Sequence, residues 1–193
     1  MNPIAVTQAK EKLERAKSAI IKLQHSKTFA ERSASWADFL VASSGVYSKL
    51  EQGSKSNGKS TAWFGRKKHD RKKNPLLSYI HHARNTEEHG IAPTTERKNG
   101  SLTISGDFSL KGDIGSGGTL NITPLPDGRF PVVEIEKPTI ILVGVTDDRF
   151  GDSFDPPNEH LGTPLSNNSP LTVANLAIAY LSILIEEASK LAK

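Results

Sequence analysis

One long apolar segment at the end of the chain restricts the fold more than any other part of the sequence. Ser169-Pro170 is a favourable helix start, and the following segment, LTVANLAIAYLSILIEEASKLAK, has apolar residues on almost every side of a helix. Its longest uncharged apolar run, Leu171 to Ile185, has 15 residues, fewer than the roughly 20 that a membrane-spanning helix needs. We therefore expect no membrane partner, and we expect other helices to bury this one.

Three further helices are predicted in the first half of the chain. The first has an apolar stripe with steps of three and four, formed by Val6, Ala9, Leu13, Ala16, Ile20 and Leu23. The second is expected from about Ser35 to Gln52. The third is expected from Pro75 to His89, because Asn74 is a good N-cap, proline suits the first helical position and Gly90 supplies a left-handed stop.

The pattern changes to strands after residue 97. Residues 101–110 alternate with period two, and residues 119–136 look like two strands joined around Asp127-Gly128, a favoured hairpin pair. Residues 138–145 are rich in β-branched side chains and indicate a buried strand, whereas residues 147–169 have the composition of a loop.

These segments predict an α+β fold with a four-helix bundle. The three N-terminal helices, in residues 1–96, would pack with the C-terminal helix, residues 170–193, because the small β-region cannot bury that helix alone. A β-rich insertion, residues 97–150, and a loop, residues 151–169, would lie between the third and fourth helices.

The stretch Gly53 to Ser60, GSKSNGKS, matches the phosphate-loop pattern G-x-x-x-x-G-K-[ST]. A working phosphate loop follows a buried strand and opens a helix. The residues before Gly53 continue an amphipathic helix, and those after Ser60 show little apolar periodicity. We therefore expect a mobile linker and no nucleotide cofactor; a nucleotide-dependent enzyme that uses Lys59 and Ser60 is kept as a third hypothesis.

A basic block follows this stretch. Eight Lys or Arg and a single acid, Asp70, lie between Lys55 and Lys73, in a chain whose net charge is only +4. Such a block is either a solvated loop or a surface that contacts RNA phosphates, with Trp63 and Phe64 stacking on bases. The candidate phosphate contacts are Arg66, Lys67, Lys68, Arg71, Lys72 and Lys73. The chain has no cysteine and its N-terminal residues lack the apolar run of a signal peptide, so we expect a soluble, cytoplasmic protein.

The helix predicted from Pro75 to His89 carries the most reactive side chains. At ~100° per residue, His82, Asn85 and His89 share a polar face, and Arg84 and Glu88 are four residues apart, so they can pair. His82 and His89 are two turns apart, ~10 Å along the axis, which is too far for one metal ion. We therefore expect no metal, and we treat His82 and Glu88 as candidate substrate contacts.

The motif Arg84-Asn85-x-x-x-His89 resembles the R-x(4–6)-H signature of HEPN (higher eukaryotes and prokaryotes nucleotide-binding) domains, in which a polar residue commonly follows the arginine. Many HEPN proteins are metal-independent endoribonucleases of toxin–antitoxin, phage-defence and RNA-processing systems. The resemblance implies that Arg84, Asn85 and His89 are catalytic, that RNA is the substrate, that the chain acts without a cofactor as a homodimer, and that an antitoxin protein is a possible partner. The β-rich insertion is not part of the common HEPN pattern.

The residue types suit this reaction. Histidine can remove the 2′-OH proton so that the oxygen attacks the adjacent phosphorus, and arginine can stabilise the charge that builds on the phosphate oxygens. Asn85 can hydrogen-bond the phosphate or orient His89. On an ideal helix Arg84 and His89 lie ~140° apart, so we expect either a distorted helix end near Gly90 or two chains that share a site.

Two other interpretations remain open. In the first, a non-catalytic HEPN-like module binds RNA, a nucleotide or a protein through the same face. In the second, the residues have no function beyond stability: Arg84 and Glu88 form a surface pair, and His89 interacts with the helix C-terminus. His160 in the late loop can reach the site, but a lone loop histidine is usually incidental.

Overall fold

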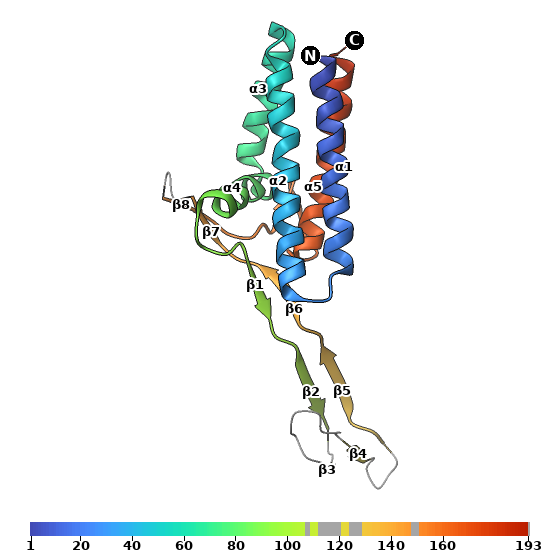
Figure 1. Cartoon of the computed structure of the whole chain (residues 1–193). Coiled ribbons are helices and arrows are strands. Elements are labelled where there is room, and N and C mark those ends of the chain that lie inside the picture. The colour runs from blue at the N-terminus through green and yellow to red at the C-terminus, as the bar shows by residue number, and fades with distance from the viewer. Residues whose placement is uncertain (107–108, 112–120, 124–128, 148–150, 193) are drawn as a thin grey trace. The chain divides into compact units, whose positions relative to one another are not determined.

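The computed structural model describes residues 1–106, 109–111, 121–123, 129–147 and 151–192 (Figure 1). These residues form an α+β fold with five α-helices and small two-stranded sheets. The chain divides into two compact units. One contains Met1–Arg97 and Ile140–Lys193, and the other contains Lys98–Thr139.

The first two helices form an antiparallel pair, α1 (Pro3–His25) and α2 (Phe29–Ser54) (Figure 1). The Asn2 side chain caps α1 by accepting a hydrogen bond from the Ile4 N–H. At α2, Thr28 and Glu31 form a capping box, in which each side chain accepts a hydrogen bond from the backbone of the other. This box makes α2 begin at Phe29, upstream of the predicted start at Ser35.

The predicted mobile linker is wrong. Gly53 and Ser54 belong to the end of α2, and a helix absent from the prediction, α3 (Gly58–Lys73), begins within the same stretch. The Asn57 side chain accepts a hydrogen bond from the Ser60 N–H at 2.9 Å and so caps α3. The phosphate-loop pattern therefore lies between two helices and is not fed by a strand.

The basic block is helical, and its aromatic side chains are not available to stack on bases. Trp63 and Phe64 are only 6% and 5% exposed. The Trp63 indole N–H donates to Glu187 Oε2 at 2.8 Å, and the Lys67 ammonium donates to Glu187 Oε1 at 2.9 Å. Burial acts to raise the pKa of the Glu187 carboxyl, but these two donors outweigh it and hold that pKa below its ordinary value.

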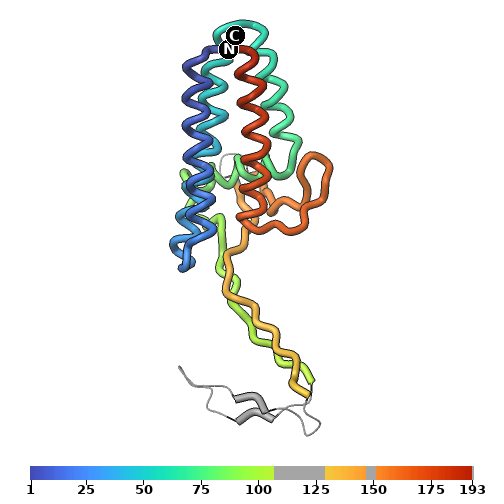
Figure 2. Tube along the Cα trace, turned by 90° about the vertical axis from the view of Figure 1, so that its right-hand side faces the viewer, coloured from blue at the N-terminus to red at the C-terminus, as the bar shows by residue number. Residues whose placement is uncertain are grey.

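The remaining helices are α4 (Pro75–His89), whose predicted bounds are confirmed, and α5 (Pro170–Lys190). In Figures 1 and 2, α1, α2, α3 and α5 run alongside one another and α4 lies across them. Four helices, rather than the predicted three, precede the strands of the described chain.

Helix α5 is buried on one face and not all round as predicted. Val173, Ala177 and Leu184 are at most 1% exposed, whereas Ile183 is 55% exposed. By length and composition alone α5 could cross a membrane, but the core helix of a soluble protein passes the same test. Here α5 packs against α1, α2 and α4.

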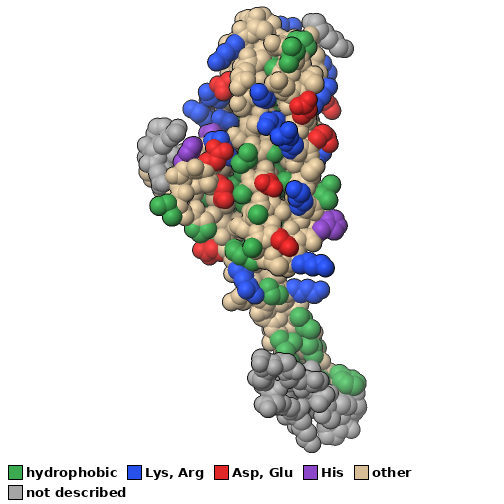
Figure 3. Space-filling model, viewed as in Figure 1, with side chains coloured by type: hydrophobic (Ala, Val, Ile, Leu, Met, Phe, Trp, Pro, Cys, Tyr) green, Lys and Arg blue, Asp and Glu red, His purple; other side chains and the backbone are tan. Residues whose placement is uncertain are grey.

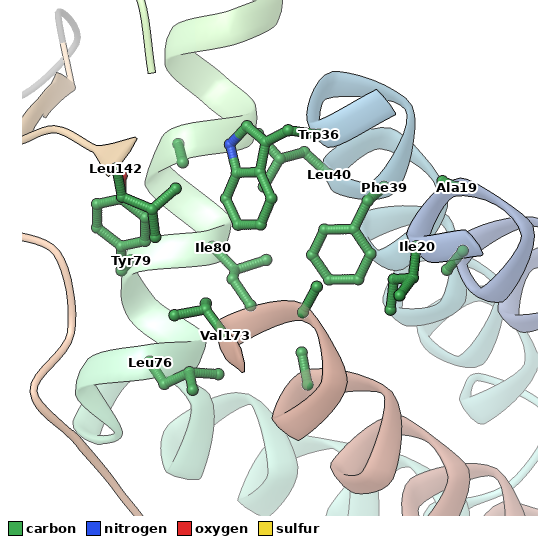
Figure 4. Packing of buried hydrophobic residues seen from close by; sticks show 14 of the residues in the cluster. Ala19, Ile20, Trp36, Phe39, Leu40, Leu76, Tyr79, Ile80, Leu142 and Val173 are labelled. Carbon is green, nitrogen blue, oxygen red and sulfur yellow. The ribbon is translucent and has the colours of Figure 1, made fainter. Parts of the chain in front are cut away.

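Two hydrophobic clusters hold the helices together. The first surrounds Trp36, Phe39 and Tyr79, and Figure 4 shows these rings packed among aliphatic side chains from α1, α4 and α5. The rings of Trp36 and Phe39 stack with their centroids 5.3 Å apart. The second cluster surrounds Val46, Leu50 and Trp63, and therefore includes α3 in the core.

Short strands of the helical unit pack against α4. β7 (Val145–Asp147) pairs antiparallel with β8 (Asp152–Phe154), and β9 (Glu159–His160) pairs antiparallel with β10 (Thr163–Pro164). The Tyr79 hydroxyl donates to the Val143 carbonyl at 2.7 Å, and the Thr86 hydroxyl donates to the Thr146 carbonyl at 3.2 Å. The segment predicted to be a loop thus contains strands.

The buried strand predicted at 138–145 is divided and only half buried. β6 (Thr139–Leu142), which pairs with β1 (Thr95–Lys98), ends before β7 begins. Ile140 and Leu142 are 6% exposed, whereas Ile141 between them is 39% exposed. Alternation with period two, rather than a continuous apolar run, therefore describes this strand.

The second unit contains two antiparallel strand pairs. β2 (Ser101–Ser105) pairs with β5 (Val132–Glu136), so that Leu102 faces Ile135 and Ile104 faces Val133. β3 (Ser109–Lys111) pairs with β4 (Asn121–Thr123). The predicted pairing of the strands on either side of Asp127-Gly128 is wrong, because β4 and β5 have other partners. The turn itself lies outside the described residues.

The packing of Trp63 predicts that α3 contributes to stability. Trp63→Ala should lower the free energy of unfolding by about 3–5 kcal/mol, because it leaves a cavity between α3 and α5 and removes a donor from Glu187. Arg66→Ala, an exposed position on the same helix, should change it by less than about 0.5 kcal/mol. Urea denaturation of both variants measures the difference. Equal, small effects would mean that α3 is not part of the folded unit.

Candidate active site

The helix that carries the predicted catalytic residues is fixed at both ends. At its start the Asn74 side chain accepts a hydrogen bond from the Leu77 N–H at 3.0 Å. At its end the Gly90 N–H donates to the Thr86 carbonyl at 2.7 Å. Gly90 is not left-handed as predicted, since its φ is −96°. A Cβ atom there would lie 2.8 Å from the Thr86 carbonyl oxygen, so the position requires glycine because of a close approach.

One face of α4 is buried and positions the opposite face. Leu76, Tyr79, Ile80 and Ala83 lie in the first hydrophobic cluster. With these side chains in the core, Arg84, Glu88 and His89 remain partly exposed, at 27%, 31% and 53% of their side-chain surface. The candidate site is therefore on the surface of a firmly packed helix.

Two of the three predicted catalytic side chains, Arg84 and His89, lie near one carboxylate oxygen. Arg84 Nη2 forms an ion pair with Glu88 Oε2, and His89 Nε2 lies 4.0 Å from the same oxygen. Arg84 Nη1 also donates to Asn85 Oδ1 at 3.4 Å. The structure thus brings Arg84, Asn85, Glu88 and His89 together.

On this single helix, Arg84 and His89 both lie near one carboxylate oxygen, although their positions on an ideal helix are ~140° apart. The ~140° separation applies to the positions where side chains leave an ideal helix. The long side chains of Arg84 and Glu88 span a helical turn, so the Glu88 oxygen lies within reach of both neighbours. The predicted sharing of a site by two chains stays a prediction.

His82 packs on β8. Its ring stacks on Phe154, with the centroids 3.6 Å apart and the planes inclined by 6°. The neighbouring His81 ring lies edge-on to it at 5.1 Å. The face of His82 that meets Phe154 is therefore covered, and this residue links α4 to the β7–β8 hairpin.

The six basic residues predicted to contact RNA fall into two groups. Three have partners within the helical unit: Lys67 binds Glu187, Lys68 Nζ lies 3.3 Å from Glu51 Oε1, and the Arg71 guanidinium lies 4.6 Å above the Tyr47 ring. Arg71 is partly buried, and this burial lowers the pKa of its guanidinium. Arg66, Lys72 and Lys73 are exposed. In the face shown in Figure 3, Lys and Arg side chains are interspersed with Asp and Glu.

Arg71 and Tyr47 line a small cavity between helices. Its volume is about 20 Å³, enough for one water molecule, and its other walls are mainly apolar side chains of α2, α4 and α5. Burial is the main cause that raises the pKa of Tyr47 above its ordinary value. The cavity is too small for a nucleotide, and among the described residues no group of three or more His, Asp or Glu side chains is placed to hold a metal ion.

His160 has a structural role that its sequence context does not indicate. The residue is buried on β9, its Nδ1 lies 3.2 Å from Asn74 Oδ1, and its ring is edge-on to Tyr180. Because Asn74 Oδ1 also caps α4, the His160 ring supports the start of the candidate site's helix. A lone histidine between turn residues carries no signal of this contact.

None of the known family models, curated protein sequences or solved structures matches this chain.

The burial of His160 predicts a pH-dependent stability. Burial lowers the pKa of the folded-state imidazole below its ordinary value of 6.5, so the unfolded chain binds a proton more readily. The free energy of unfolding should therefore decrease as the pH falls below about 6.5. Above that pH the contribution of the neutral His160 to stability should be complete. His160→Asn, which retains a donor near the Nδ1 position, should reduce this decrease.

Thermal unfolding between pH 8 and pH 5 measures the effect, with His69→Asn on the exposed side of α3 as the matched control. If His160→Asn and His69→Asn show the same pH dependence as the original chain, the pKa of His160 does not differ between the folded and unfolded states.

Proposed function

We propose that this chain is a metal-independent endoribonuclease of the HEPN type, with its active site on α4. The observation that carries the proposal is the Glu88 oxygen that Arg84 contacts and His89 approaches at 4.0 Å. An anion is thus held between a permanent cation and a side chain suited to proton transfer near neutral pH. A phosphodiester of RNA is also an anion, and its cleavage needs both a cation and a group that transfers a proton.

Each residue has a role in the proposed reaction. His89 removes the 2′-OH proton, and the oxygen then bonds to the adjacent phosphorus while the bond to the 5′-oxygen breaks. The proton held by His89 is returned to that 5′-oxygen, which leaves a cyclic phosphate, a 5′-OH and a neutral His89. Arg84 stabilises the charge that develops on the phosphate oxygens. Asn85 contacts Arg84 and orients it. None of these steps requires a metal ion or a cofactor.

The proposal includes a homodimer as the working unit and RNA as the substrate. In this part of the proposal α1, α2, α4 and α5 correspond to the HEPN-like bundle, and α3 is an additional helix. The half-exposed His89 lies on the outside of α4, so a second copy can exclude water from the site and add a second Arg84–His89 pair. The biological role would be that of a toxin, a phage-defence nuclease or an RNA-processing enzyme, with an antitoxin protein as a possible partner.

The Arg84–Glu88 pair also favours a second candidate function. An arginine that is already neutralised stabilises a developing charge less well, which suits a non-catalytic module that binds RNA through α3 and α4. This candidate differs from the first in one respect: it binds RNA without cleaving it.

The nuclease proposal predicts RNA cleavage that persists in EDTA and depends on α4. Arg84→Ala and His89→Ala should each reduce the cleavage rate by at least about 100-fold, because each removes a group that acts in the transition state. Gel analysis of an RNA oligonucleotide measures this. His25→Ala, an exposed histidine at the end of α1, should leave the rate unchanged.

The same assay separates the candidate functions. RNA binding without cleavage would favour the non-catalytic module, and cleavage lost on adding EDTA would contradict the metal-independent mechanism. Mixing the two inactive variants tests the dimer, since partial recovery of activity shows that a site takes Arg84 and His89 from different chains. No recovery after proven subunit exchange assigns both residues to one chain.

The exposed basic residues of α3 predict how RNA binding depends on salt. Replacing Arg66, Lys72 and Lys73 together with Gln should weaken binding and make the slope of log K against log[salt] shallower by up to about 2, at ~0.7 per lost phosphate contact. The cleavage rate at saturating RNA should change little. A matched triple variant on α1, Lys10, Arg15 and Lys22 to Gln, removes the same charge from exposed positions. Equal slopes for the two triple variants would exclude α3 as the contact surface.

A further inference from the structure

Glu88 does more than form a surface ion pair with Arg84, because its carboxylate also lies near His89. Its Oε2 atom is approached by both Arg84 and His89, by the first through an ion pair and by the second at 4.0 Å. In the proposed reaction, Arg84 contacts a non-bridging oxygen of the scissile phosphate, and His89 contacts the 2′-hydroxyl that attacks the same phosphorus. The carboxylate therefore stands where a substrate oxygen would stand.

Several donors of Arg84 already have a partner or are covered. Nη2 pairs with Glu88, Nη1 donates to Asn85, and Nε is buried without a hydrogen-bond partner among the described residues. Each Nη atom carries a second N–H, but a phosphate that reaches this guanidinium meets the Glu88 carboxylate at Nη2. Glu88 is the acceptor that carries a charge, and two anions cannot share the site without repulsion.

We propose that Glu88 is an internal substitute for the substrate phosphate, which RNA must displace before Arg84 can act. This inference rests on the proposed function and adds a form of regulation to it: the site is closed to weakly held anions and opens only to a ligand that binds elsewhere as well. The exposed basic residues Arg66, Lys72 and Lys73 supply such additional contacts.

The pair is suited to displacement. Both side chains are partly solvent-exposed, and exposed ion pairs four residues apart on a helix are weak. Glu88 lies in the last turn of α4, where its side chain can rotate into solvent without moving the packed face. His89, which is 53% exposed, then faces the bound phosphate instead of the carboxylate.

The test is Glu88→Gln in the full chain, which keeps the size of the side chain and removes its charge. The probe is a fluorescent single-stranded DNA oligonucleotide in EDTA, because it carries phosphodiesters but has no 2′-OH and cannot be cleaved by the proposed reaction. We expect Glu88→Gln to bind about three- to tenfold more tightly than the original chain. The slope of log K against log[salt] should become steeper by about 0.7, since Arg84 gains a phosphate contact.

Two controls make the result specific. Glu14→Gln breaks a similar ion pair on α1, between Lys17 and Glu14, and changes the net charge by the same amount. It should leave affinity nearly unchanged. In an Arg84→Ala background, Glu88→Gln should no longer improve binding, because the gain acts through Arg84.

The outcomes separate this inference from the proposed function. Tighter, Arg84-dependent binding in Glu88→Gln supports the substitute role of Glu88 even if neither protein cleaves RNA, in which case the nuclease proposal alone fails. If the original chain cleaves RNA but Glu88→Gln binds equally or less tightly while circular dichroism shows an intact fold, Glu88 positions Arg84 and does not compete with substrate, and the inference is overturned.

Discussion

The helical unit depends on the burial of α5 by helices that come much earlier in the chain. One end of α5 enters the first hydrophobic cluster and the other end enters the second, through Val173, Ala174, Ala177, Leu181, Leu184, Ile185 and Ala188. Each large aliphatic side chain that becomes fully buried contributes about 1.5–3 kcal/mol. Helices α1, α2 and α4 have apolar faces that need a partner, and α5 contacts all three.

Two glutamates of this unit each lie beside two potential donors, with different consequences. Glu187 accepts from Trp63 and Lys67 and so attaches α3 to α5 beside buried aromatic rings. Glu88 contacts Arg84 and lies near His89 on the surface. The first carboxylate joins two helices, and its donors belong to the fold. The second joins residues of one helix, and its neighbours are partly exposed to solvent.

Local signals predicted the helices that begin with strong caps and carry regular apolar stripes. Asn74-Pro75 and Ser169-Pro170 correctly indicated α4 and α5. Helix α3 was missed because its two large apolar residues, Trp63 and Phe64, are adjacent and show no helical period. What places α3 in the core is contact with α5, far away in the sequence, and local patterns do not contain that information.

In the candidate site, as in the helices, the sequence predicted the features that local spacing determines and missed the others. The spacing of Arg84, Glu88 and His89 was sufficient to select these residues and to predict the Arg84–Glu88 pair. Their approach to one oxygen was not predicted, because the angle between backbone positions ignores the reach of long side chains. The contact between His160 and Asn74 depends on β9 lying over the start of α4, which no feature near His160 indicates.

The late position of α5 also affects how the chain is made. Residues 90–169 separate α4 from α5, so about 80 residues are added after α4 before the last helix begins. At roughly 5–20 residues per second this takes on the order of 4–16 s, whereas a helix forms in about a microsecond. Throughout that interval the apolar residues of α1, α2 and α4 that pack on α5 lack this partner. The nascent chain therefore exposes apolar surface of the kind that chaperones bind until α5 has left the ribosome.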